Sequence, residues 1–284
     1  MISLNNPDSE LYIPDHSDLT VALTRTTHLG IGAHQDDLEV MCVPAIIDCY
    51  GSDTAWFSGI IVTNGSGSAR DGAYAAYSDD DMMAVRREEQ KKAAHLGDYS
   101  VLALLNHSSA TVKDPQTTAA EDDILRLLVA MKPQYVYIHN LADKHPTHIG
   151  VAMNTLRAIR RMPREIRPKQ LIGCEVWRAL DWMPDNDKVV LAIRNHENLA
   201  QALIGVFDSQ VAGGKRYDLA IMGRRRANAT FFQSHSVDSA NLIDFGMDLT
   251  PLVEDDTIDP CEFVLNHINN FANDVRAKIS AFNR

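Results

Sequence analysis

The feature that most constrains the fold is an alternation of short apolar runs with longer amphipathic stretches between residues 27 and 161. The apolar runs predict strands near residues 28–33, 56–62, 101–105 and 135–138, and the amphipathic stretches predict helices near 38–47, 82–96, 121–131 and 148–161. Strands that alternate with helices are joined by crossovers, which produce a parallel sheet covered on both faces. We therefore predict an α/β, Rossmann-like fold with a mostly parallel sheet and helices on both faces.

The segments on either side of this alternation are less regular. Residues 1–26 are polar and without a clear period, so we expect them to form an N-terminal arm that lies on the domain. Residues 27–200 are expected to form the core, and residues 201–284 a C-terminal extension packed on it, in a single domain overall. Further strands and helices are expected near residues 171–177, 188–193, 196–210 and 260–282.

The composition excludes several classes of protein. A chain with 45% hydrophobic and 23% charged residues has enough apolar mass to fold, and its net charge of −11 argues against a nucleic-acid partner. No apolar run approaches the ~18 residues that cross a bilayer, the N-terminus has no signal-peptide pattern, and the four cysteines form no CxxC. These features predict a cytoplasmic protein without membrane insertion; a homo-oligomer is left open.

Two predicted loops carry clusters of metal-ligand side chains. Residues 33–39, with the sequence AHQDDLE, follow the first predicted strand, and residues 143–148, with the sequence DKHPTH, follow the fourth. In open parallel sheets, functional groups gather at the carboxyl ends of strands. His34, His148 and one aspartate of the first cluster would supply three zinc ligands and leave a fourth position open, as catalytic zinc sites do.

The two adjacent aspartates cannot both serve one ion comfortably. Consecutive residues that enter a helix point about 100° apart. One of Asp36 and Asp37 would therefore bind the metal, while the other could act as a general base toward water. His145 lies three residues before His148, on nearly the same side of the next helix, where it could stabilise an oxyanion or protonate a leaving amine.

Each cluster also has a purely structural interpretation. Acidic residues at a helix start serve as caps and interact favourably with the helix dipole, so Asp36, Asp37 and Glu39 could be an ordinary helix N-terminus. A proline followed by threonine is likewise a common helix start. The occurrence of both clusters in one chain favours the metal site.

The combined motifs resemble those of a known family. The segment at 33–39 is similar to the AHPDDxE motif of the PIG-L/LmbE-like zinc-dependent N-acetylglucosaminyl deacetylases, and HPTH at 145–148 is similar to their HPDH motif. Residues 86–97 resemble the family's arginine-led helix, and the segment beginning KPQYVY at 132 resembles the strand before HPDH. The resemblance covers roughly residues 27–160, and several motifs together are more specific than one.

The resemblance assigns roles to individual residues. It implies one zinc ion per chain with His34, Asp37 and His148 as ligands, Asp36 as general base, His145 as the second catalytic group and Arg86 as a substrate or acetate contact. Two positions depart from the family pattern. Gln35 replaces a proline, which should alter only loop stiffness, and Thr147 replaces the aspartate that can brace the preceding histidine. We expect His145 to need another orienting partner, for which Asp143 is the nearest candidate.

Two further segments are candidates for substrate binding. The glycine-rich loop at residues 64–80 lacks the spacing of a nucleotide-binding loop, and we expect it to form a flexible rim of the active site. Residues 213–226 form a basic patch in an acidic chain, which is equally compatible with a solvated helix and with binding of a polar or anionic substrate. Tyr217, in this patch, is a substrate-binding candidate because the family often has a C-terminal tyrosine near the oxyanion.

The sequence thus predicts a zinc-dependent hydrolase that removes the N-acetyl group from an N-acetylglucosamine-type amino sugar or glycoside. Its expected partner is a small-molecule amino-sugar substrate. GxSxG and HExxH are absent from the sequence, so it gives no support to a serine hydrolase elbow or to that zinc protease class. The alternative is a non-catalytic or nucleotide-binding Rossmann-like protein in which the acidic turn only caps a helix.

Overall fold

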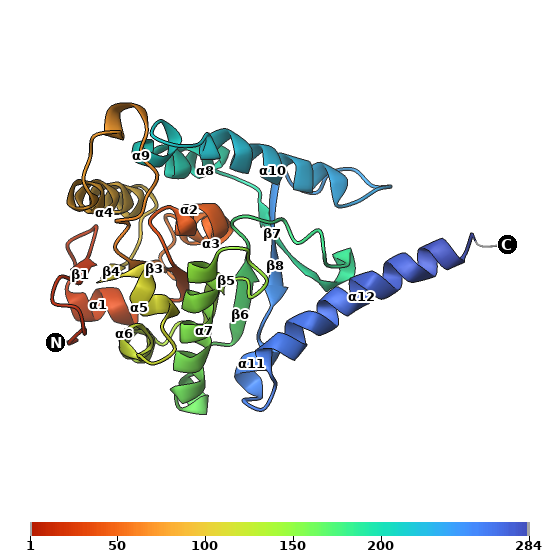
Figure 1. The fold of residues 1–284 in the computed structure, drawn as a ribbon, viewed down its shortest axis with the longest axis horizontal. Coiled ribbons are helices and arrows are strands. Elements are labelled where there is room, and N and C mark those ends of the chain that lie inside the picture. Colours follow the sequence, from red (N-terminus) through yellow and green to blue (C-terminus); the bar gives the residue numbers. More distant parts are fainter. Residues whose placement is uncertain (1, 283–284) are drawn as a thin grey trace.

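A mixed sheet of eight strands runs through the computed structural model, which describes residues 2–282 (Figure 1). The strands are β1 (Glu10–Tyr12), β2 (His28–Gly32), β3 (Phe57–Thr63), β4 (Leu102–His107), β5 (Tyr135–His139), β6 (Gln170–Cys174), β7 (Lys188–Ile193) and β8 (Leu242–Asp248). Their order is β1-β4-β3-β2-β5-β6-β8-β7. The central strands β4, β3, β2, β5 and β6 pair in parallel, whereas β1, β8 and β7 pair antiparallel. The predicted fold class is confirmed.

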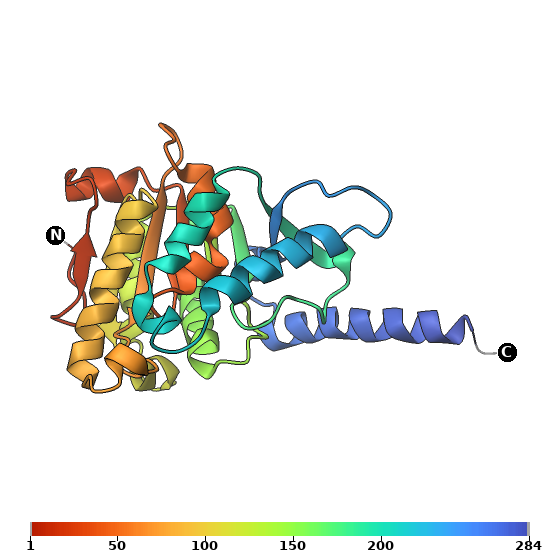
Figure 2. The same cartoon turned by 90° about the horizontal axis from the view of Figure 1, so that it is seen from above.

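Helices cover both faces of this sheet, as the view from above in Figure 2 shows. They are α1 (Leu19–Thr24), α2 (Asp37–Met41), α3 (Val43–Cys49), α4 (Asp79–Leu96), α5 (Ser109–Lys113), α6 (Ala119–Met131), α7 (Pro146–Arg161), α8 (Glu197–Gly205), α9 (Asp208–Val211), α10 (Tyr217–Phe231), α11 (Pro251–Glu254) and α12 (Pro260–Ser280). Among the residues that the structure describes, no helix combines the length and apolar character needed to cross a bilayer.

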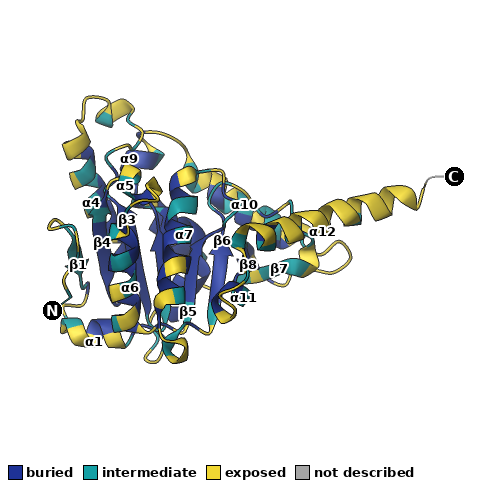
Figure 3. Ribbon diagram, turned by 60° about the horizontal axis from the view of Figure 1, so that its bottom comes forward, coloured by how far each residue is buried: buried dark blue, intermediate teal, exposed yellow. Residues whose placement is uncertain are grey.

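Each face of the sheet has its own apolar core. Along β3, Ile60 and Val62 belong to the cluster that includes residues of α6 and α7, whereas Phe57 and Ile61 belong to the cluster that includes residues of α3 and α8. Strands whose two faces are both buried are typical of sheets with crossover helices. The central strands are accordingly buried along their length (Figure 3).

Two glycines in β2 allow α2 to lie close to the sheet. A Cβ atom on Gly30 would be 2.9 Å from the side chain of Leu38, and a Cβ atom on Gly32 would be 3.0 Å from the Cβ of Asp37. Glycine permits this close approach because it has no side chain. The Gly-x-Gly sequence in β2 therefore helps to position Asp37 at the carboxyl end of the strand.

The structure adds strands in both flanking segments. β1 lies in the expected N-terminal arm and pairs with β4 at the sheet edge, and β8 lies in the expected C-terminal extension between β6 and β7. β1 is too short to show a period, and Asp244 and Gly246 interrupt the apolar run of β8. Since both flanking segments join the same sheet, we propose that residues 1–26, 27–200 and 201–284 form one domain.

One predicted helix is divided in the structure, and another helix forms where the sequence left two alternatives open. The single helix expected near residues 38–47 is divided at Cys42 into α2 and α3, and Pro44, near the start of α3, has no N–H to continue the first helix. α10 occupies the basic segment for which the sequence left a helix and a substrate-binding segment as alternatives. Its first residue is Tyr217, whose position is described with the site.

Candidate metal centre

The two clusters of candidate ligands meet at one edge of the sheet. β2 lies between β3 and β5 and pairs in parallel with both, so the strand order reverses direction at β2 and β5. Such a switch point opens a crevice at the carboxyl ends of the strands. Residues 33–37 follow β2 and residues 140–148 follow β5, and both segments enter this crevice.

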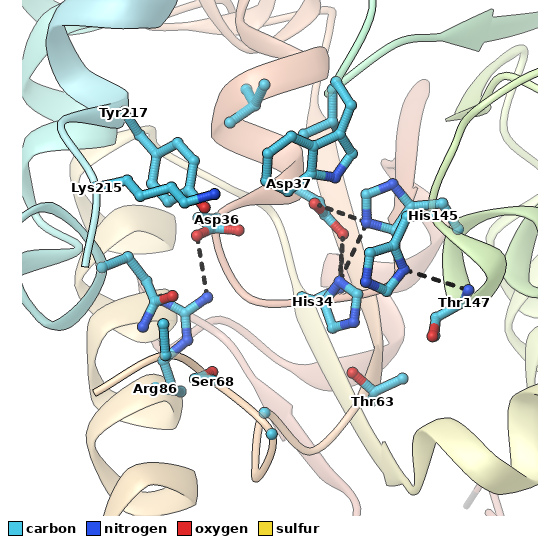
Figure 4. Close-up of a pocket in the computed structure, with 18 of the residues that line it drawn as sticks. His34, Asp36, Asp37, Thr63, Ser68, Arg86, His145, Thr147, Lys215 and Tyr217 are labelled. Carbon is cyan, nitrogen blue, oxygen red and sulfur yellow. Dashed lines mark hydrogen bonds and ion pairs between the residues drawn. The ribbon is translucent and has the colours of Figure 1, made fainter. Parts of the chain in front are cut away.

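Three donors face one another at this point, and we call His34, Asp37 and His148 the donor triad. Figure 4 labels His34 and Asp37 of this triad. Nδ1 of His34 lies 3.2 Å from Nε2 of His148 and 3.4 Å from Oδ2 of Asp37, and Nε2 of His148 lies 3.5 Å from Oδ1 of Asp37. Ligand atoms that each lie about 2.1 Å from a tetrahedral zinc ion are about 3.4 Å apart. The spacing of the donor triad therefore fits a zinc ion without rearrangement.

A hydrogen bond to the backbone orients the carboxylate of the triad. The N–H of His34 donates to Oδ2 of Asp37 at 2.6 Å. Although burial opposes ionisation, the neighbouring His148 holds the pKa of Asp37 well below its ordinary value. Asp37 is therefore ionised, as a metal ligand must be.

Asp143 orients the second histidine of the triad. Its Oδ2 lies 3.1 Å from Nδ1 of His148, and its Oδ1 accepts the backbone N–H of His145 at 2.8 Å. Although burial opposes ionisation, the hydrogen bond with His148 lowers the pKa of Asp143. A carboxylate on the far nitrogen of a ligating histidine fixes its tautomer and ring orientation. The expectation that Asp143 braces the ring of His145 is thus wrong, since the ring it contacts is that of His148.

His145 is oriented by the start of α7 instead. Its Nδ1 accepts the backbone N–H of Thr147 at 3.3 Å, so this ring caps the helix. Its ring packs edge-on against His34 and stacks on His148. Burial, together with these two histidines, lowers the pKa of His145. A neutral ring whose Nδ1 accepts a hydrogen bond carries its proton on Nε2.

His139 is a fourth histidine, which the sequence analysis missed. It is fully buried at the end of β5, stacks on His148 with 3.9 Å between ring centroids, and accepts the N–H of Ala33 at Nε2. Burial lowers its pKa to about 4, so the ring is neutral. Asp37, His139 and His148 form a second group whose donor atoms are close enough to hold an ion, as do His34, His145 and His148. A histidine at the carboxyl end of a predicted central strand was the available signal.

Asp36 faces away from the donor triad. It adopts a left-handed backbone conformation with φ of 92°, which is uncommon and costly for a residue other than glycine. Its N–H donates to Oε1 of Gln90 at 3.0 Å, and its Oδ2 lies 3.1 Å from Nη2 of Arg86. It makes no capping hydrogen bond to α2, so the interpretation of this side chain as a helix cap is wrong.

Arg86 lies on α4 and is buried, with 2% of its side chain exposed. Besides Asp36, it contacts the backbone carbonyl of Gln35, to which its Nη2 donates, and Glu89, whose Oε2 lies 3.5 Å from its Nη1. Arg86 is therefore a buried partner of the metal loop rather than a surface arginine. It also lines the cavity described below.

A family comparison agrees with this geometry. The PIG-L family model, described as GlcNAc-PI de-N-acetylase, matches residues 29–159, which include β2, β5 and all the side chains described above. This part of the chain belongs to the PIG-L family. Curated protein sequences gave no match to the chain.

Solved structures share the fold of this chain at low sequence identity. N,N'-diacetylchitobiose deacetylase from Pyrococcus horikoshii is 14% identical, with a TM-score of 0.61 over 85% of this chain and 90% of that chain. A conserved protein of Thermus thermophilus is 14% identical, with a TM-score of 0.62 over 82% and 98%. GalB, the 4-carboxy-2-hydroxymuconate hydratase from Pseudomonas putida, is 14% identical, with a TM-score of 0.63 over 79% and 95%. These likenesses establish the fold alone.

The PIG-L site opens into a cavity of about 720 Å³. The donor triad, Asp36, Arg86 and His145 lie in its wall, together with residues 65–69 of the glycine-rich loop and part of the basic segment at 213–226. Its volume lies within the range of small-molecule sites, roughly 300–1,000 Å³. The loop therefore lies at the rim, as expected.

Tyr217 also lines this cavity, although it lies far from the donor triad in the sequence. It is the first residue of α10, and its ring lies edge-on to Trp177 at 6.0 Å between centroids. Burial raises the pKa of Tyr217, so the phenol keeps its proton and can donate a hydrogen bond. Lys215 and Arg224 of the same basic segment line the cavity, whereas Arg225 is buried and pairs with Asp244 at 2.8 Å. The basic segment is thus divided between the cavity wall and the core.

Proposed function

We propose that this protein is a zinc-dependent hydrolase that removes the N-acetyl group from an N-acetylglucosamine-type amino sugar or glycoside. The main support is the donor triad, whose spacing fits a tetrahedral ion and which lies in a cavity large enough for a sugar. Two imidazoles and one carboxylate suit zinc among the common metals. PIG-L membership of residues 29–159 favours a deacetylase within the hydrolases.

The residues around the triad have distinct proposed roles. A zinc ion held by His34, Asp37 and His148 would act as a Lewis acid toward the acetamide carbonyl and the attacking water. Asp36 would take a proton from that water. Because Arg86 holds the Asp36 carboxylate apart from the triad, its oxygens stay available for this proton transfer.

His145 is proposed to donate a hydrogen bond to the oxygen of the reacting carbonyl. The backbone N–H of Thr147 donates to Nδ1 of His145, which leaves the Nε2–H of the neutral ring free to donate. A donor at this position stabilises the oxyanion that develops as water adds to the carbonyl. When the C–N bond breaks, the proton that Asp36 took from the water would be returned to the nitrogen, and acetate and the free amine would leave. This hydrogen bond from the backbone of Thr147 thus sets the tautomer of His145, the role that the family motif gives to an aspartate.

The cavity favours a polar, sugar-sized substrate. Tyr217 and Lys215 supply donors opposite Asp36, and Trp177 supplies an aromatic surface. We propose Tyr217 as a substrate contact on this ground, and Arg86 as a second one because it also lines the cavity. We keep the cytoplasm, which the sequence analysis predicts, as the proposed location.

Release of free amine from a panel of N-acetylglucosaminides tests the proposal. We expect fluorescamine-reactive product from at least one compound, loss of this product with a chelator, and its recovery on addition of zinc. His34→Ala should abolish it because a ligand is lost. His235→Ala is the matched control, since His235 is exposed and is not among the residues that line the cavity.

The same experiment separates the alternative of a non-catalytic or nucleotide-binding protein. That alternative requires no zinc and predicts equal metal content in the parent, His34→Ala and His235→Ala. About one zinc per chain in the parent and in His235→Ala, with little in His34→Ala, would support the deacetylase. No amine release from any compound by zinc-loaded protein would contradict it.

A further inference from the structure

The last helix of the chain leaves the body of the molecule. α12 has 21 residues, of which only Val264 is buried, and its second half projects away from the sheet (Figures 1 and 2). The first half of α12 contacts the rest of the molecule, where His267 and Asn270 reach Asp187. Figure 3 shows the rest of this helix as exposed. A projecting helix of this length gains little stability from its own backbone, so its apolar residues need a partner.

The exposed side of α12 carries a regular apolar seam. Seven exposed residues follow one another at steps of four and three residues alternately: Cys261, Leu265, Ile268, Ala272, Val275 and Ile279 in α12, and Phe282 just after its end. The exposed fraction reaches 60% at Ile279 and 87% at Phe282. An alternating step of four and three residues over three heptads is the pattern of a coiled-coil seam.

The charges beside the seam indicate which partner fits. Glu262, Asn269 and Arg276 are seven residues apart, so they occupy the same flanking position of successive heptads. If a second α12 lies antiparallel and crosses at Asn269, Glu262 of each copy faces Arg276 of the other. Flanking positions of the same kind meet in antiparallel pairs, and opposite charges there set partner and orientation. In a parallel pair, the residues next to Glu262 and Arg276 would be uncharged.

We propose that two copies of this chain associate through α12 as an antiparallel, two-fold symmetric pair. The seam is self-complementary, which such symmetry requires, and the antiparallel arrangement sets the two helix dipoles in opposite directions. A membrane surface is the less suitable occupant, because the polar face of α12 is rich in asparagine and the chain carries a net charge of −11. The inference does not depend on the reaction proposed above.

Sedimentation velocity of the full chain over a range of concentrations tests this association. We expect a dimer for the parent and a monomer for the double variant Val275→Glu and Ile279→Glu, which places charges in the seam beyond the contacts of α12 with the body. Ala277→Glu adds a charge to the same helix outside the seam and should stay dimeric. Circular dichroism verifies that each variant is folded.

A charge exchange tests the antiparallel register. Glu262→Arg alone and Arg276→Glu alone should each weaken the dimer, because each sets like charges opposite one another. The double exchange should restore it, although both changes are unfavourable to the helix dipole. A dimer that the double exchange fails to restore would overturn this register.

Three other outcomes would overturn the proposal. The parent could be monomeric at every concentration, or its dimer could survive the two seam substitutions, which would assign it to another surface. The parent could also be monomeric and bind vesicles of anionic lipid through α12, in which case the seam serves a membrane.

Discussion

Asp36 and Asp37 have different partners because the backbone turns sharply between them. The left-handed conformation of Asp36 directs its carboxylate to Arg86, whereas Asp37 follows at the first position of α2 and faces three histidines. The motif located both aspartates in the sequence, but their spacing alone left them equivalent. His139 had no motif around it, and its position depends on the packing of β5 against β2.

Replacing Asp143 tests the support of the donor triad. Asp143→Asn keeps an oxygen for the N–H of His145 but removes the carboxylate from the ring of His148. Loss of such a partner weakens metal affinity by about 10–100-fold. Competition with a chelating dye should show this loss of zinc affinity. Asp53→Asn, at an exposed carboxylate, should leave the affinity unchanged, and an equally unchanged affinity in Asp143→Asn would remove the proposed support.

Replacing Arg86 tests whether the fold depends on its charge. Arg86→Ala leaves Asp36 and Glu89 without their buried cation, and breaking a buried pair costs about 3–5 kcal/mol. Chemical denaturation should show a decrease of this size in the free energy of unfolding. The next residue gives a matched control: Arg87 is partly exposed, lies 3.7 Å from Glu10, and should cost about 1 kcal/mol or less. Equal costs for the two variants would place Arg86 outside the core.

The central elements are the ones that patterning predicts best. β2, β3, β5 and α7 follow the predicted ranges closely, because apolar runs flanked by polar turns persist over several residues. β8 escaped prediction because its interior contains Asp244. That carboxylate is compensated by Arg225 from α10, which is a tertiary contact that no local pattern reveals. Local sequence thus specifies the strands that carry the site, whereas β8 depends on contacts across the fold.

The buried carboxyl group of Glu175 makes the free energy of unfolding depend on pH. This residue follows β6 and accepts hydrogen bonds from the N–H of Leu180 and from Nε1 of Trp182. Burial raises its pKa to about 7, above the value of about 4.3 in an unfolded chain. The native state therefore holds a proton that the unfolded state has released, and its contribution to stability is lost as pH rises through this window.

Denaturation at about pH 5 and about pH 8 measures this contribution. We expect the free energy of unfolding of the parent to decrease by up to about 3 kcal/mol from this group as pH rises. Glu175→Gln cannot ionise and should show a smaller decrease. Glu165→Gln, at an exposed glutamate, should behave as the parent does. The same pH dependence in all three proteins would exclude Glu175 as its source.

At the scale of the whole molecule, the sheet connects segments that the sequence separates. The expected arm supplies β1 and the expected extension supplies β8, while α10 and the loop at residues 65–69 both line the cavity. Composition predicted an ordered, acidic chain, but it could not predict that basic residues collect at the cavity wall. Such an arrangement depends on which segments the fold brings together.

The central claim is that Asp37 holds the metal and Asp36 performs the chemistry. Bound zinc and turnover, measured together in Asp36→Asn and Asp37→Asn, test it most directly. Asp36→Asn should keep about one zinc per chain while kcat falls by about 10²–10⁴-fold, the usual contribution of a general base. Asp37→Asn should lose most of its zinc. The reverse result, with zinc lost from Asp36→Asn and kept by Asp37→Asn, would contradict the roles proposed for the two aspartates.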